Sequence, residues 1–132
     1  MPHHSALGTK RSDTMQITLI ILIGIHILAG VFWAGSTFAI VRSGGAGAAA
    51  LFGPQMGAAT VTVLAGVGLW GMLHRGPEGP MEHTLALGAL CAIAAAGAQG
   101  ATRKKNPLKG QRIAAGLLLI TVICMAIARY VG

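Results

Sequence analysis

The sequence carries little charge, very few acidic residues and few aromatic ones. Only 10% of the 132 residues are charged and 5% are aromatic, whereas 54% are hydrophobic. Soluble domains carry roughly 25% charged residues, so water is not the main solvent of this chain. The acidic residues are Asp13, Glu78 and Glu82. Because all three lie outside the longest apolar stretches, no buried carboxylate pair or triad is expected, which argues against a hydrolase and favours a non-enzymatic role over an enzymatic one.

Other patterns are missing as well. The sequence lacks the alternating segments of roughly ten residues and the aromatic girdles that are typical of a β-barrel. It also lacks a glycine loop followed by Lys-Ser or Lys-Thr, the pattern of a phosphate-binding loop. The net charge of +7 would suit nucleic acid, but the basic residues lie at the ends of apolar runs and not on one amphipathic face. They are better explained as topology signals and lipid-headgroup contacts, and no nucleic-acid partner is expected. Cys91 and Cys124 lie within apolar runs, where we expect them to pack as small hydrophobic residues.

Four uncharged stretches remain, separated by charges, glycines and prolines. A helix needs about 20 residues to cross roughly 30 Å of hydrocarbon. The sequence therefore predicts an all-α, polytopic membrane protein whose single domain, residues 15–132, is a bundle of four transmembrane helices behind a polar N-terminal tail, residues 1–14. The first apolar run exceeds the roughly 7–15 residues of a signal-peptide core, so we expect it to be retained. The predicted helices cover residues 15–42, 55–74, 81–102 and 112–131.

Glycine and proline set the expected helix ends. Residues 43–47 are too rich in glycine to be helical, and Gly53-Pro54 places the start of the second helix near Gln55. Residues 75–80 form a turn whose Pro80 suits the first turn of the next helix. A basic turn that ends in Pro107 stops the third helix.

The basic residues also predict the orientation. The side that holds both termini carries four of them: Lys10, Arg11, Arg75 and Arg129. The opposite side carries six: Arg42, Arg103, Lys104, Lys105, Lys109 and Arg112. The more basic side is expected in the cytoplasm, so we predict a multi-pass protein of a bacterial-type inner (cytoplasmic) membrane with both termini on the periplasmic or exterior side.

Small residues indicate where the helices pack on one another, because close backbone approach drives association in lipid. In the third predicted helix, small residues recur at every fourth position and predict one smooth stripe; they are Gly88, Ala92, Ala96 and Gly100. In the fourth, Gly116 and Ala128 predict a similar face with Cys124 between them.

His26 is the most informative polar residue, because it lies about nine positions, or roughly 13 Å, along the first predicted helix from the point where this helix is expected to enter the membrane. Gly30 and Trp33 follow at i+4 and i+7, so the three residues share one helix face. Gly30 would leave a gap between an imidazole and an indole, which could hold a flat cofactor or contribute to a metal site. The alternative is a neutral histidine that only hydrogen-bonds a neighbouring helix.

His74 and His83 flank the turn between the second and third predicted helices. With Glu78 and Glu82 nearby they could form a shallow metal site, since imidazole and carboxylate are ordinary metal ligands; the alternative is interfacial histidines without a ligand. One ion could not also reach His26, because about 13 Å of depth separates them. A haem could be held by residues that lie farther apart, because its axial ligands approach from opposite faces of the iron.

The stretch from Ile25 to Ser36, IHILAGVFWAGS, resembles the first-helix signature of the copper-resistance protein D superfamily, in which a helix-embedded histidine precedes a Trp-x-Gly-like element. Four-helix membrane protoporphyrinogen oxidases are similar in this helix. The resemblance covers about twenty residues and implies haem b or copper as the cofactor, with His26 as the associated histidine. The oxidases carry a lysine in their third helix, whereas residues 81–102 contain none, so the resemblance does not extend to that activity.

Two functions follow as expectations. The first is a small membrane bundle associated with a metal or haem, with His26, Gly30 and Trp33 at the cofactor and His26, His74 and His83 as candidate metal ligands. The second is a non-catalytic accessory subunit of a larger membrane complex of the respiratory or photosynthetic type, whose small-residue faces fit against other membrane protein subunits. The shortage of intramembrane polar residues argues against a transport pore.

Overall fold

A computed structural model describes the backbone of residues 5–132, and the side chains from residue 10 onward. The described residues form four α-helices and a final turn of 3-10 helix, with no strand among them. The elements are α1 (Ser5–Arg42), α2 (Ala48–Leu73), α3 (Pro80–Thr102), α4 (Pro107–Ile127) and η1 (Ala128–Tyr130). All four α-helices are long and apolar enough to cross a bilayer. The predicted all-α, four-helix membrane bundle is confirmed.

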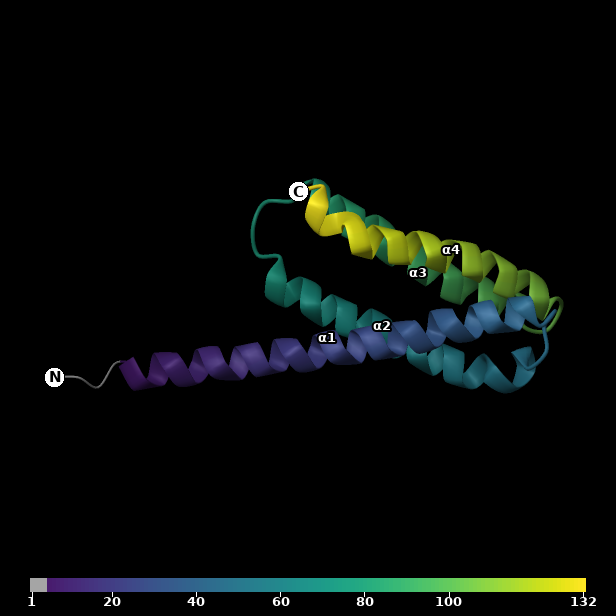
Figure 1. The fold of residues 1–132 in the computed structure, drawn as a ribbon, viewed down its shortest axis with the longest axis horizontal. Helices are drawn as coiled ribbons and strands as arrows, with labels where there is room; N and C mark the ends of the chain where they lie inside the picture. Colours follow the sequence, from purple (N-terminus) through teal and green to yellow (C-terminus); the bar gives the residue numbers. More distant parts are fainter. Residues whose placement is uncertain (1–4) are drawn as a thin grey trace.

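The helices form two antiparallel pairs, α1 with α2 and α3 with α4 (Figure 1). Contacts between α1 and α4 join the pairs, whereas α2 contacts α3 and α4 less. The pairs converge where the two short interhelical turns lie and diverge toward the α2–α3 loop (Figure 1). The start of α1 and the C-terminal end point to the same end of the bundle, and the six basic residues expected on the cytoplasmic side all gather at the other end, in and next to the two turns.

The first helix begins earlier than the sequence suggested. The first four residues of the predicted polar tail lie outside the described part, but the tail from Ser5 to Thr14 continues α1 without a break. At 1.5 Å per residue the 38 residues of α1 span about 57 Å, more than the hydrocarbon requires. The polar first turns therefore project beyond the bundle (Figure 1), and no helix-breaking residue separates them from the apolar span.

The turn between α1 and α2 starts where predicted, after Arg42, but it is shorter than predicted, because α2 does not begin at Gln55. Residues 43–47 are non-helical, and the φ angles of Gly44, Gly45 and Gly47 are 72°, 101° and 80°, values that favour glycine. The second helix begins directly afterwards at Ala48 and contains Gly53 and Pro54. Pro54 removes only the hydrogen bond to the carbonyl of Ala50, which is exposed near the basic end of the bundle.

The third helix spans the predicted residues with Pro80 in its first turn, whereas the fourth begins five residues before its predicted start. Pro107, which was expected only to stop the third helix, is also the first residue of α4. The side chain of Asn106 caps that helix by accepting a hydrogen bond from the backbone N–H of Lys109, at 3.1 Å. The same short segment thus ends one helix and begins the next.

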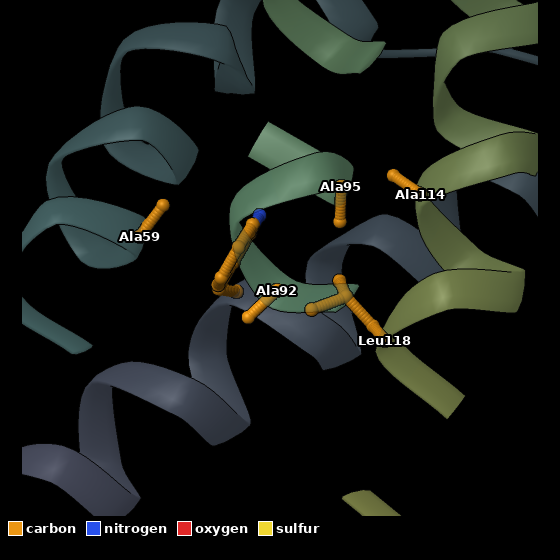
Figure 2. Close-up of a cluster of buried hydrophobic side chains, with 6 residues drawn as sticks. Ala59, Ala92, Ala95, Ala114 and Leu118 are labelled. Atoms are coloured by element: carbon orange, nitrogen blue, oxygen red, sulfur yellow. The ribbon is translucent and has the colours of Figure 1, made fainter. Parts of the chain in front are cut away.

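The core is built from small side chains. Figure 2 shows Ala92 and Ala95 of α3 facing Ala114 and Leu118 of α4, with Ala59 of α2 on the other side. Trp33 of α1, which is 1% exposed, completes this cluster. Alanine lets helix backbones approach closely, so one indole, one leucine side chain and a few methyl groups fill this apolar part of the core.

The small-residue stripes are displaced from their predicted positions. The buried residues of α3 are Gly88, Ala92, Ala95 and Gln99, whereas Gly100 is exposed. A strict four-residue spacing drifts around a helix of 3.6 residues per turn, which carries Gly100 off the interface. On α4 the prediction for Gly116 is wrong, because it is exposed and faces open space, while Cys124 and Ala128 are buried as predicted.

Candidate functional site

The imidazole of His26 lies against α2. Its Nδ1 is 2.8 Å from the backbone carbonyl oxygen of Thr62, and a Cβ added at Gly66 would lie 3.1 Å from its Cε1. Gly66 therefore lets the ring rest on the backbone of α2. Sixteen residues, or about 24 Å of helix, separate His26 from Arg42, so the ring lies within the span of the hydrocarbon, in the half farther from the basic end.

The hydrogen bond to Thr62 determines which nitrogen of His26 is free. A carbonyl oxygen only accepts, so Nδ1 carries the proton, and this tautomer of the imidazole has its lone pair at Nε2. Nε2 has no partner among the described residues, and it is not among the fully buried atoms without a partner. His26 therefore presents one nitrogen donor that is fixed in tautomer and accessible from outside the helix pair.

Gly30 and Trp33 share the bundle-facing side of α1 with His26, but α2 and α3 occupy the space around them. An added Cβ at Gly30 would lie 3.7 Å from Cγ2 of Thr62, so the side chain of Thr62 fills the gap that the sequence suggested. The indole of Trp33 is directed to α3, where its Nε1 donates a hydrogen bond of 2.9 Å to Oε1 of Gln99. A planar cofactor between the imidazole and the indole would require Thr62 to move.

A cluster of glutamines lies at the centre of the bundle, next to Trp33. Gln55, Gln99 and Gln111 come from α2, α3 and α4, and each is at most 3% exposed. Nε2 of Gln99 donates hydrogen bonds of 3.0 Å to Oγ1 of Thr37 and to Oε1 of Gln111. Nε2 of Gln111 donates to Oε1 of Gln55 at 2.9 Å. We call Trp33, Thr37 and the three glutamines the amide cluster; it connects all four helices.

The amide cluster is chemically suited to holding the helices together. Amides that pair with one another avoid the cost of an unsatisfied polar group in a medium without water. Its members carry no charge, and no acid or base in the cluster could take part in proton transfer. The arrangement is therefore a structural link, and one that orients Trp33 by its N–H group.

The histidines of the α2–α3 loop lie in two separate pairs. His74 stacks on Trp70, with ring centroids 4.8 Å apart, and its Nε2 lies 3.9 Å from Oε1 of Glu82. His83 and Glu78 form a second pair at 4.0 Å, and both are largely exposed. Glu82 also accepts a hydrogen bond of 2.8 Å from the backbone N–H of Gly79 and so caps the start of α3.

The structure does not gather the predicted metal ligands at one point. Among the side chains of residues 10–132, no three of the types His, Cys, Asp and Glu lie close enough to hold an ion together. His74 keeps one unused atom, since its Nδ1 is the only fully buried side-chain nitrogen or oxygen without a partner in the described part. Of the residues named as candidate ligands, His26 is the one whose free nitrogen is both accessible and embedded in a span.

Sequence reasoning missed the amide cluster. The spans were delimited by their charged residues, and glutamine carries no charge. Three glutamines inside or next to predicted spans were nevertheless a signal, because a polar side chain in lipid is costly unless it is paired within the bundle. Comparison of the chain with protein-family models, curated proteins and solved structures finds no match, so the resemblance of residues 25–36 stays a prediction.

Proposed function

We propose that this membrane bundle binds haem b or a copper ion through Nε2 of His26. The observation that carries the proposal is the hydrogen bond between Nδ1 and the carbonyl oxygen of Thr62. Histidines that ligate metals usually donate their other ring N–H to a carbonyl or carboxylate, which fixes the tautomer and orients the ring. His26 has this arrangement, because Nδ1 donates to the carbonyl oxygen of Thr62 and Nε2 keeps a free lone pair.

The membrane strengthens the argument. A polar atom that faces hydrocarbon without a partner costs free energy, and a ligand at Nε2 would remove that cost. Because no set of three ligand side chains is gathered within residues 10–132, a single strong donor fits an axial position of haem better than a closed ion site. Bound haem would supply one-electron chemistry. Thr62 fills the space beside Gly30, so the proposal depends on the imidazole nitrogen and not on a preformed slot.

The test is the absorption spectrum and metal content of the full-length protein, expressed with a haem supply and purified in mild detergent. We expect a Soret band or stoichiometric copper in the native protein and its loss in His26→Ala. His83→Ala is the matched control and should keep the signal, because His83 is largely exposed in the first turn of α3 and its ring pairs with Glu78. Added imidazole should restore the band in His26→Ala if the fold is intact. A colourless, metal-free native protein, or a His26→Ala variant with an unchanged spectrum, would contradict the proposal.

A second candidate function is that of an accessory subunit, and the outer face of α1 favours it. None of residues 15–28 is buried in the structure. Gly24, Leu28, Val31 and Gly35 lie at i, i+4, i+7 and i+11, hence on one face, and Leu28 and Val31 are 74% and 67% exposed. A Cβ added at Gly24 or Gly35 would meet nothing within 4 Å. Small residues that leave room beside apolar ones are typical of helix–helix interfaces in lipid.

Blue native electrophoresis of mildly solubilised membranes tests this second function. The native protein should migrate in an assembly, and Gly24→Leu should release it, because the added side chain fills a space that the chain itself leaves open. Gly97→Leu on α3 is the control, since it also faces open space on a different helix and should leave the assembly intact. Migration of the native protein as a single chain would rule the accessory role out.

A further inference from the structure

A cavity of about 190 Å³ opens between α2, α3 and α4 at the basic end of the bundle. This volume is far more than the roughly 10–15 Å³ that one water molecule needs. The residues that matter for its chemistry are Ala48, Phe52, Gln99, Arg103, Lys104 and Gln111. The cavity thus combines an apolar wall from α2, two cations from the α3–α4 turn and two amides from the amide cluster.

The amides give the cavity a fixed polar lining. Gln99 and Gln111 are 2% and 3% exposed, and the hydrogen bonds of the cluster hold both side chains in place. The amide nitrogen of Gln111 has two N–H groups, of which one is donated to Oε1 of Gln55. The second has no acceptor among the described residues, so one buried N–H donor is available at a residue that lines the cavity.

The cations beside the cavity have no acidic partner. The guanidinium carbon of Arg103 lies 4.4 Å from the ring centroid of Phe52, and this stacking leaves the edge of the guanidinium, with its N–H donors, free to bind an anion. The acidic residues of the chain, Asp13, Glu78 and Glu82, all lie toward the opposite end. Two helices, α2 and α4, also begin at the cavity, and their amino ends contribute partial positive charge.

We propose that this cavity binds the phosphate group of an anionic phospholipid. Arg103, Lys104 and the spare N–H of Gln111 supply donors for phosphate oxygens. Basic pockets between transmembrane helices at the membrane surface are suited to anionic headgroups, and the wall of Phe52, Ala48 and Ala49 offers an apolar surface for the first carbons of the lipid. This site is independent of His26, which lies in the other half of the span.

Native mass spectrometry of the full-length protein tests the proposal. The protein is released from micelles that contain equal amounts of phosphatidylglycerol and phosphatidylcholine. We expect preferential retention of phosphatidylglycerol, and a loss of about tenfold in that preference in the double variant R103Q/K104Q. The matched control is K105Q/R112Q, which removes the same charge from exposed residues outside the cavity lining and should change the preference less than about threefold.

A third variant tests the geometry without changing the charge. Phe52→Leu removes the ring that positions Arg103 and should weaken retention by about two- to fivefold. The proposal is overturned if the native protein shows no preference, if Phe52→Leu has no effect, or if both double variants lose the preference equally, which would indicate only the general charge of the surface. Calorimetric titration of the delipidated protein with inorganic phosphate and with a short-chain phosphatidylglycerol separates the two sources of phosphate. Phosphate binding as tight as lipid binding would overturn the assignment to a lipid.

Discussion

Replacing Gly110 by alanine is expected to separate α3 from α4 and to lower the stability of the bundle by about 2–3 kcal/mol. Gly110 is buried in the first turn of α4. An added Cβ would collide with Oγ1 of Thr102 and would lie 2.9 Å from the backbone carbonyl oxygen of Ala98. The threonine side chain could rotate away, but the carbonyl belongs to the backbone of α3, so one helix must move.

The buried thiol of Cys124 provides the measurement. Cys124 is buried at the α3–α4 interface, where a Cβ added at Gly88 would lie 3.0 Å from the Cβ of Cys124. In a Cys91→Ala background it is the only thiol, and the SDS fraction at which a maleimide labels it reports the separation of the two helices. We expect Gly110→Ala to be labelled at markedly lower SDS than the parent.

Gly116→Ala is the control for this prediction. It lies on the same helix but faces open space, so it shares the gain in helix propensity, up to about 1 kcal/mol, without the clash. Cys124 in the Gly116→Ala variant should be labelled at the same SDS fraction as in the parent, or at a higher one. If Gly110→Ala behaved like Gly116→Ala, the close approach of α3 and α4 at this position would be refuted.

The fold was largely predictable because the membrane imposes it. Charged residues cannot lie deep in hydrocarbon, so their positions delimit the spans, and the four helices and their alternating direction followed from that. Helix starts were less predictable. Ala48 and Pro107 begin their helices earlier than expected, because prolines near a helix start cost few backbone hydrogen bonds. The N-cap of α4, Asn106, was not predicted, because it lies in a polar turn where an asparagine is expected in any case.

The candidate site was predictable only in part. The position of His26 in a span could be read from the residues around it. Its partner could not, because the acceptor is the backbone carbonyl of Thr62, and any residue could have supplied that group. Likewise, the spacing of Gly30 and Trp33 gave the correct face of α1 but could not show that Thr62 fills the gap, since this depends on the rotation of α2. The cavity beside Arg103 could not be predicted from the sequence, because its lining comes from three helices and depends on how they pack together.

Replacing Gln99 by leucine is expected to destabilise the bundle by about 1–3 kcal/mol. Leucine keeps most of the volume but removes three hydrogen bonds, to Trp33, Thr37 and Gln111. The indole N–H then loses the one partner that it has among the described residues, while it stays buried. In the Cys91→Ala background, Cys124 should again become reactive at lower SDS. Gln16→Leu is the matched control, because Gln16 is exposed and its replacement should leave the midpoint unchanged.

A double-mutant cycle separates the hydrogen bond from the packing. Trp33→Phe removes the N–H together with part of the ring, so it is destabilising alone, but once it is made, Gln99→Leu no longer leaves that donor unsatisfied. We expect the double variant to be more stable than the two single effects added together would make it, by about 0.6 kcal/mol and at most about 1.7 kcal/mol, the average and the upper value for side-chain hydrogen bonds between membrane helices. Strict additivity would mean that Gln99 and Trp33 stabilise the bundle independently of each other, and the bond of 2.9 Å between them would then not stabilise it.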